Sequence, residues 1–338
     1  MHLTLLFPGL LWPAAAGDEP YRQARAPALE LALGRARIAG AAGGTLAWLA
    51  RQWRLGDAPP WGALSLLGDG GTPDAHFWMR ADPVHLRVHR DHLVLADATA
   101  FAIAQTEAHA ITDALNAHFA GDGFAFHPLR PDRWYLRVAA PPRLRTTPLA
   151  EVAGRDIEGR LPAGDDALAW HRHVNEIQML LHALPANEAR ETRGELPVNS
   201  VWPWGGGVLP QGLPRPFEVI ACDDPVIAGL ALASGADQRP AAAGLDAMLP
   251  TPTRNALVVD DTFAAATRYG DLTAWQQALA RSDAAWIAPA LDALRGGRLA
   301  GLDLVLGGGE RMLTASLTRG ELRRFWRRPH PLTRLARP

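Results

Sequence analysis

Two tryptophans and three glycines stand close together in the stretch VNSVWPWGGGVLP, Val198–Pro210. Each indole would bury on the order of 150–250 Å² of surface if it were packed. Pro203, between them, favours an extended or turning backbone. Gly205, Gly206 and Gly207 permit positive φ and allow backbone N–H groups to approach a ligand closely. The pattern predicts a glycine turn, which is either a structural corner or the lip of a ligand pocket.

The charged and sulfur-containing residues exclude several kinds of chemistry. All 34 basic residues are arginine, so Schiff-base catalysis and a Walker-type phosphate lysine are excluded. The single cysteine, Cys222, excludes an internal disulfide framework and a cysteine-based metal cluster. Its apolar neighbours Ile220 and Ala221 predict a buried, inert thiol. The net charge of −1 provides no overall attraction to nucleic acid or anionic lipid, so we expect neither as a partner.

The first residues could belong to a leader peptide or to the folded protein. Leu3–Ala16 is apolar and ends in three alanines, loosely like a signal-peptide cleavage site. It lacks a positively charged start, and Pro8 and Pro13 interrupt it. We therefore expect a buried strand at Leu3–Phe7 followed by a turn. No apolar run approaches the ~20 residues of a membrane span, and we expect a cytoplasmic protein.

The first half of the chain changes from helical to strand periodicity. Apolar spacing predicts helices over Ala28–Ile38 and Thr45–Trp53. Strict alternation then predicts a hairpin over Val84–Leu95, with its turn at Arg90–Asp91. A helix over Glu107–Phe119 and a strand over Trp134–Val138 complete a small α+β lobe.

His85 and His89 carry spacing that would place two metal ligands on one face of a helix. On a strand the same residues lie roughly 13 Å apart at ~3.3 Å per residue, so they cannot ligate one ion. Together with Arg87 they form a basic strand face, which is either solvated or an anion site.

The second half alternates between strands and helices. Strands are predicted over Phe217–Ala221 and Ala256–Asp260, with a final strand over Leu302–Leu306 that ends in three glycines. Helices are predicted over Asp224–Ser234 and Leu272–Leu294. This alternation predicts a mostly parallel sheet covered by helices.

The last twenty residues, Arg319–Pro338, are rich in arginine. One interpretation is a solvated terminal helix and tail in which Phe325 and Trp326 dock onto the fold. The other is a binding surface for an acidic partner or a polyphosphate.

The stretch His182–Pro210 resembles one region of the archaeal-type cofactor-independent phosphoglycerate mutases. That family carries an HPxNxxR segment, an N-x-x-W-x-W-G-x-G loop, and then a strand and a helix. Weaker similarity covers Phe77–Leu86, Phe217–Gly235 and Val258–Leu272, so the likeness touches most of the chain. The chain also resembles a shortened bacterial branch described as RpfE-type regulatory proteins. The residues that match the motif are Pro185, Asn187, Arg190, Asn199, Trp202, Trp204, Gly205 and Gly207.

The resemblance implies the alkaline phosphatase superfamily fold and phosphoryl transfer through a Ser or Thr nucleophile and two divalent metals about 4 Å apart. The family's ligands are absent from the matching positions. The first strand ends in Phe7–Gly9 where the family has Asp-Gly, and Asp261–Gly270 reads DTFAAATRYG where it has Asp-x-x-x-His. Leu304–Arg311 reads LVLGGGER where it has Asp-His, and no histidine occurs between His182 and His330. We therefore expect no metal site.

The sequence thus predicts an α/β protein with a mostly parallel sheet covered by helices. An alkaline phosphatase-like core over residues 1–76 and 140–338 would carry a small inserted α+β lobe over residues 77–139. We expect no catalytic residue and no cofactor, and a non-catalytic regulatory role or binding of a phosphorylated small molecule. The expected ligand-binding residues are Asn199, Trp202, Trp204, Gly205, Gly206, Gly207, Arg80 and Arg190.

Two other functions stay open. One is a structural partner subunit that binds another protein through the arginine-rich C-terminus. The other is an active phosphoglycerate mutase or phosphatase with relocated metal ligands. Its carboxylates and possible nucleophiles would be Asp260, Asp261, Asp271 and Asp303, with Thr262 or Ser200.

Overall fold

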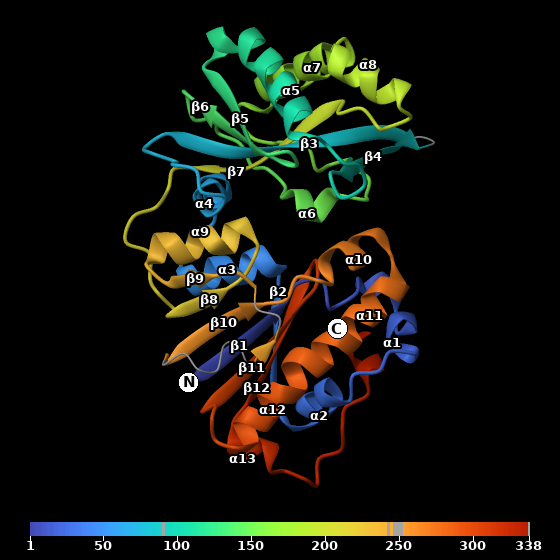
Figure 1. Cartoon of the computed structure of the whole chain (residues 1–338), viewed down its shortest axis with the longest axis vertical. Helices are drawn as coiled ribbons and strands as arrows, with labels where there is room; N and C mark the ends of the chain where they lie inside the picture. Colours follow the sequence, from blue (N-terminus) through green and yellow to red (C-terminus); the bar gives the residue numbers. More distant parts are fainter. Residues whose placement is uncertain (90–91, 242–243, 246–252, 337–338) are drawn as a thin grey trace. The chain divides into compact units, whose positions relative to one another are not determined.

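The computed structural model describes residues 1–89, 92–241, 244–245 and 253–336 (Figure 1). The chain divides into two compact units, each assembled from separate stretches of sequence. The first unit contains Met1–Arg54, Leu213–Asp224 and Ser234–Pro338, and the second contains Leu55–Gly212 and Pro225–Ala233.

The first unit is built on a seven-stranded sheet, whose strands are β1 (His2–Phe7), β2 (Arg37–Ala42), β8 (Val219–Ala221), β9 (Asp237–Arg239), β10 (Asn255–Val259), β11 (Gly301–Gly307) and β12 (Arg311–Leu317). Their order is β2-β12-β11-β1-β10-β8-β9. β11, β1, β10, β8 and β9 run parallel to one another. β12 pairs antiparallel with β11, and the edge strand β2 pairs antiparallel with β12. The predicted α/β class with a mostly parallel sheet is confirmed.

Helices cover this sheet, and they are α1 (Glu19–Arg22), α2 (Pro27–Arg35), α3 (Thr45–Trp53), α10 (Ala264–Tyr269), α11 (Leu272–Ser282), α12 (Ala288–Arg295) and α13 (Arg319–Leu322). Alternate side chains of β1 point to one face, where Leu3 and Leu5 join a core with Leu29 and Leu33 of α2 and with residues of α11 and α12. Thr4 points to the other face and lines a cavity with Trp48 of α3.

The second unit has an antiparallel sheet formed by β3 (Phe77–His89), β4 (His92–Asp97), β5 (Phe124–Arg130), β6 (Arg133–Val138) and β7 (Ser200–Gly207). β3 is its central strand: β6 and β4 pair with its two halves along one edge, and β7 pairs along the other. The predicted hairpin is confirmed as β3 and β4, whereas its turn at Arg90–Asp91 lies outside the described residues. The helices of this unit are α4 (Trp61–Gly68), α5 (Gln105–His118), α6 (Leu149–Val152), α7 (Ala167–His182), α8 (Pro185–Thr192) and α9 (Pro225–Ser234).

This unit extends well beyond the lobe expected over residues 77–139. The reason is strand pairing: β7 comes from outside that range but hydrogen-bonds along β3 from Trp78 to Val84. Helix α7 packs its Trp170 and Ile177 into the same apolar core as β3 and β6. These long-range pairings leave no signal in local periodicity.

Two predicted helices differ from those in the structure. The helix expected over Ala28–Ile38 stops at Arg35, because Ala36 turns to an extended backbone (ψ 163°) and the chain continues as the edge strand β2. The single helix expected over Leu272–Leu294 is interrupted by a π-helical turn at Asp283–Ile287. Pro289 follows this turn and cannot donate to the helical ladder.

The strand expected over Leu302–Leu306 is β11, and it is not the last strand of the chain. β11 is joined by the predicted glycines to β12, which pairs antiparallel with it. None of the described helices combines the length and apolar character that a membrane span requires.

Helices α4 and α9 approach each other backbone to backbone. A Cβ built on Gly229 of α9 would lie 1.8 Å from the carbonyl oxygen of Leu64, and one on Gly68 of α4 would lie 1.9 Å from that of Pro225. These distances are far below van der Waals contact, so only glycine permits this crossing.

We expect Gly229→Ala to lower the free energy of unfolding by about 1–3 kcal/mol, because the two helices must move apart. Urea denaturation followed by circular dichroism measures this. Gly121→Ala is the matched control, since a Cβ at Gly121 meets no atom within 4 Å. Equal stability of the two variants would show that the helix crossing is not tight.

Candidate functional site

The tryptophan and glycine stretch forms strand β7 and not the predicted turn. Trp202 and Trp204 are 3% and 6% exposed. The indole N–H of Trp202 donates to the carbonyl oxygen of Thr147 (2.8 Å), and that of Trp204 donates to Asp82 Oδ2 (2.7 Å). Both indoles are therefore buried with their polar atoms satisfied.

The glycines of β7 make room for neighbouring elements. Gly205 has φ +67°, and a Cβ there would lie 2.7 Å from Cβ of Trp61 at the start of α4. A Cβ on Gly206 would lie 2.5 Å from the ring of Phe77, and one on Gly207 would lie 2.5 Å from Cβ of Pro60. The strand needs glycine at these positions because α4 and β3 pack directly against its backbone.

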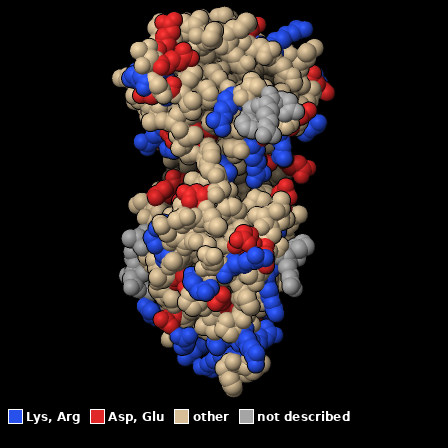
Figure 2. Space-filling model, turned by 90° about the vertical axis from the view of Figure 1, so that its right-hand side faces the viewer, with Lys and Arg blue, Asp and Glu red and all other residues tan. Residues whose placement is uncertain are grey.

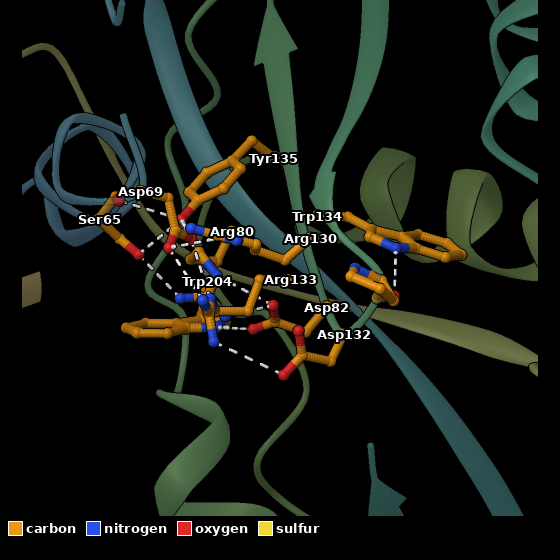
Figure 3. A network of polar contacts seen from close by, with 11 residues as sticks. Ser65, Asp69, Arg80, Asp82, Arg130, Asp132, Arg133, Trp134, Tyr135 and Trp204 are labelled. Carbon is orange, nitrogen blue, oxygen red and sulfur yellow. Dashed lines mark hydrogen bonds and ion pairs between the residues drawn. The ribbon is translucent and has the colours of Figure 1, made fainter. Parts of the chain in front are cut away.

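Arg80 lies at the centre of a buried polar network (Figure 3). The strand register places it opposite Tyr135 of β6 and Trp204 of β7, and its guanidinium carbon lies 5.4 Å from each ring centroid. Arg80 Nε and Nη2 donate to Asp82 Oδ1 at 2.9 and 2.5 Å, and Nη1 donates to Ser65 Oγ at 2.8 Å. The carboxylates around Arg80 outweigh the effect of its burial and raise its pKa.

Asp69, at the end of α4, extends this network. It accepts from the Tyr135 hydroxyl (2.6 Å) and from Nε and Nη2 of Arg133 (both 2.9 Å). Burial alone would raise the pKa of Asp69, but these hydrogen bonds and the positive charges of Arg133 and Arg80 lower it. Two arginines thus face two aspartates, and both guanidinium groups have their partners inside the protein.

Arg190 and Asn199, the other expected ligand residues, also bind within the second unit. Arg190 is fully buried and donates to Glu107 Oε2 (2.8 Å) and to the carbonyl oxygens of Ala102 (2.7 Å) and Leu196 (2.8 Å). Asn199 exchanges two hydrogen bonds of 2.7 Å with the backbone of Leu86. The matched motif therefore joins α8 and β7 to α5 and β3.

A shallow cavity of about 530 Å³ lies beside Arg190. Its charged walls are Glu107, Arg193 and Glu195, and Arg193 pairs with both acids at 2.5 and 2.7 Å. Arg190 lies 2.8 Å from Glu107 and 3.6 Å from Glu195, so the two acids are balanced by Arg193 and Arg190.

The carboxyl ends of the parallel strands in the first unit form the edge where α/β proteins usually bind ligands. Asp260 and Asp261 follow β10, and Asp223 and Asp224 follow β8 next to it. Burial raises the pKa of Asp261, and the negative charges of Asp224 and Asp260 raise it further. This edge concentrates negative charge.

The donors at this edge do not fit a pair of metal ions. Asp260 accepts from the Thr262 hydroxyl (2.7 Å) and from Ser282. The first unit contains only His2, at the start of β1, and His330, whose backbone N–H binds Glu30 of α2. The ring of Phe7, at the end of β1, packs edge-on against Phe263 at 6.1 Å.

The alternative carboxylates do not converge either. Asp271 caps α11 by accepting from the Ala274 N–H (2.9 Å). Asp303 lies within β11 at the level of Thr4, and Ser200 belongs to the other unit. Within the described ranges, the group of three that brings ligand atoms within 4.8 Å of one another is His92, Asp156 and Glu158, in the second unit.

Cys222 is buried, as predicted. Burial and the nearby negative charges of Asp224 and Asp223 raise its pKa. The thiol is therefore neutral and unreactive.

A cavity that sequence reasoning missed lies at the amino end of β1. It has a volume of about 400 Å³, and Trp48, Phe217, His2 and Asp303 line part of it. His2 Nε2 lies 2.8 Å from Asp303 Oδ2. The sequence carries only a weak signal for this pair. His2 and Asp303 are each a polar residue in an otherwise apolar strand, and 301 positions of chain separate them.

Comparison with known proteins shows that part of the chain is similar in sequence to phosphoglycerate mutases. It matches no protein-family model. It is 30% identical over 154 residues to a probable 2,3-bisphosphoglycerate-independent phosphoglycerate mutase of Geobacter sulfurreducens, a match covering 45% of this chain and 38% of that protein. It is 28% identical over 139 residues to the corresponding mutase of Methanosarcina mazei, covering 39% of this chain and 35% of that protein. The matches thus span well under half the length of these relatives.

Two solved structures share the fold over nearly the whole chain. A cofactor-independent phosphoglycerate mutase of Thermoplasma acidophilum aligns with a TM-score of 0.51 and 17% identity, covering 99% of this chain and 94% of that one. A Pyrococcus horikoshii protein aligns with a TM-score of 0.57 and 14% identity, covering 94% and 87%. At these identities the likeness establishes the fold.

We expect Arg80→Met to lower the free energy of unfolding by about 3–5 kcal/mol, because Asp82 would keep a buried charge without its partner. Urea denaturation measures the change. Arg87→Met, on the exposed part of the same strand, is the control and should have little effect. The double variant Arg80→Met/Asp82→Leu should be less destabilised than Arg80→Met alone; if it is not, the charge pair does not govern stability here.

The His2–Asp303 pair predicts a pH dependence of stability. The hydrogen bond to Asp303 raises the pKa of His2 above 6.5. The pair therefore stabilises the fold fully below about pH 6.5, and this contribution is lost as pH rises through the raised pKa. For a half-exposed pair we expect a loss of at most about 1 kcal/mol.

Unfolding midpoints measured across this range should fall more for the wild type than for His2→Gln. A ring-proton NMR titration gives the pKa of His2 directly. Exposed His182→Gln is the control and should follow the wild type. Parallel pH profiles of the wild type and His2→Gln would contradict the prediction.

Proposed function

Because the chain is phosphoglycerate mutase-like in sequence and fold, we propose that it is a non-catalytic member of this structural group with a regulatory or binding role. It would retain the α/β scaffold and would not transfer phosphoryl groups through two metal ions.

One observation carries this proposal, namely the donor set at the carboxyl edge of the parallel sheet. Two adjacent divalent ions need several carboxylate and imidazole ligands that converge. The edge offers aspartates after β8 and β10, whereas β1 is followed by Pro8–Gly9 and β11 by Gly308–Gly309. Neither histidine of this unit belongs to these strand ends. The loss extends over several strands, so replacing one ligand would not restore the centre.

The remaining aspartates support a second candidate, a metal-dependent mutase or phosphatase with relocated ligands. Burial raises the pKa of Asp261, and the negative charges of Asp224, Asp260 and Asp223 raise it further. Such a group of carboxylates attracts divalent cations. Thr262, whose hydroxyl donates to Asp260, would be the nucleophile of such an enzyme.

Binding of a phosphorylated metabolite by Arg80 or Arg190 stays a prediction. Both guanidinium groups are engaged inside the second unit, so a phosphate would have to displace Asp82 or Glu107. Exposed groups are better suited to a binding role. Assignment to the RpfE-type branch and a cytoplasmic location also stay predictions.

The test is a calorimetric titration of chelator-stripped protein with Mn²⁺ and with Zn²⁺, together with phosphoglycerate mutase and phosphatase assays in the presence of each metal. We expect no stoichiometric site at the carboxyl edge and no metal-dependent turnover. His92→Ala separates any binding at the exposed His92, Asp156 and Glu158 group from binding at the carboxyl edge.

Asp261→Asn is the matched variant for the carboxyl edge and should behave as the wild type does. Two micromolar or tighter sites that disappear in Asp261→Asn, accompanied by turnover, would establish the relocated-ligand enzyme and overturn the proposal.

A further inference from the structure

The segment Arg323–Arg328, with the sequence RRFWRR, is anchored at both ends. Before it, Leu322 is 3% exposed at the end of α13. After it, Leu332 is 2% exposed, and the His330 N–H donates to the Glu30 carbonyl oxygen of α2 (2.9 Å). The chain also packs closely on α2 here, since a Cβ on Gly34 would lie 2.2 Å from the Arg328 carbonyl oxygen. The segment is a surface held in place and not a loose tail.

The two aromatic residues of this segment face solvent. Phe325 is 81% exposed and Trp326 is 68% exposed, and their rings form an edge-to-face pair at 5.3 Å. The prediction that they dock onto the fold is therefore wrong. All twelve tryptophans lie in the described part of the chain, and Trp326 alone is exposed. Exposing the apolar surface of two aromatic side chains to water is unfavourable. Such exposed pairs are typical of interaction sites.

Arginines flank the aromatic pair on both sides. Arg323, Arg324, Arg327 and Arg328 form no ion pair and no side-chain hydrogen bond with any residue that the structure describes. The nearest acid in sequence, Glu321, is engaged by Thr318 at the start of α13 and by Arg37 (2.8 Å). Figure 2 shows basic side chains crowded around uncharged atoms at the lower end of the first unit. Arg324 is close enough to contribute to the lowered pKa of Glu321, so the positive charge of this surface is compensated only in part.

We propose that Arg323–Arg328 is a docking surface for an acidic segment of a partner protein. Guanidinium groups bind carboxylates with two parallel hydrogen bonds. Tryptophan and arginine are the residues most enriched among those that dominate protein interfaces. The complementary partner carries aspartates or glutamates, with apolar side chains between them that cover Phe325 and Trp326.

Other charged partners fit less well. Nucleic-acid affinity comes largely from many phosphate contacts, and four arginines on one short segment of a chain with net charge −1 provide few. The edge-to-face geometry also covers one ring face that a base would need for stacking. A membrane surface is normally bound by a long amphipathic helix, whereas α13 has four residues.

The experiment uses the full chain and a fluorescein-labelled synthetic peptide of glutamates interrupted by leucines, with binding followed by anisotropy. A peptide with glutamine in place of every glutamate is the control. We expect the acidic peptide to bind, to bind more weakly at high salt, and to protect Trp326 from acrylamide quenching. The neutral peptide should not bind.

Variants assign the binding to this surface. Arg324→Glu/Arg327→Glu and Trp326→Ala should each weaken peptide binding by about tenfold or more. Trp326 and Arg327 are exposed and Arg324 is partly exposed, so unfolding midpoints should change little. Arg172→Glu/Arg281→Glu reverses two exposed arginines elsewhere and should bind the peptide as the wild type does.

Three outcomes would overturn the proposal: no binding of the acidic peptide, binding that survives Arg324→Glu/Arg327→Glu, or equally tight binding through the same residues of single-stranded oligothymidylate or phosphatidylserine vesicles. The inference goes beyond the proposed function. The metal titration involves none of these residues, so either proposal can fail alone.

Discussion

The ion pair between Arg80 and Asp82 is the interaction on which the second unit depends. Both residues lie on the central strand of its sheet, where nearly complete burial makes an unpaired charge costly. Arg80 therefore has to be surrounded by acceptors and aromatic rings from α4, β6 and β7. The indole of Trp204 completes the arrangement by donating to Asp82. One buried pair thus joins four elements, and several of the glycines nearby allow the backbones to come close enough.

The residues singled out in the stretch His182–Pro210 also have structural roles within the second unit. Asn187 donates to two backbone carbonyl groups and accepts from the N–H of Val198. Arg190, Trp202 and Trp204 are likewise buried with internal partners. These positions maintain the unit whatever the catalytic state of the protein. The carboxyl edge of the other sheet is different, because its side chains follow strand ends and can change without disturbing the strands.

The two units also differ in whether their charged side chains have ion-pair partners. In the second unit, acids and arginines pair inside the protein. In the first, aspartates gather at the carboxyl ends of β8 and β10, and arginines beside α13 remain without ion-pair partners among the described residues. Uncompensated charge at a surface contributes little to folding and is available for recognition of another molecule.

Sequence by itself determined the elements whose signal is local. The apolar strand Leu3–Phe7, the helix Thr45–Trp53 and the hairpin strands around Val84–Leu95 follow from periodicity, since burial of one face imposes a period of 3.6 or 2. The α/β class and the absence of histidines from the carboxyl ends of the parallel strands could also be inferred from the sequence. Tertiary structure alone decided that β7 joins β3, that the expected ligand residues Arg80 and Arg190 are internally paired, and that Phe325 and Trp326 face solvent. Those outcomes depend on which residues meet in the folded chain, and side-chain type and spacing do not encode them. β7 and β3 lie more than a hundred positions apart, and Glu107 lies 83 positions from Arg190. Even Arg80 and Asp82, two positions apart, form a buried pair only because other elements pack around them.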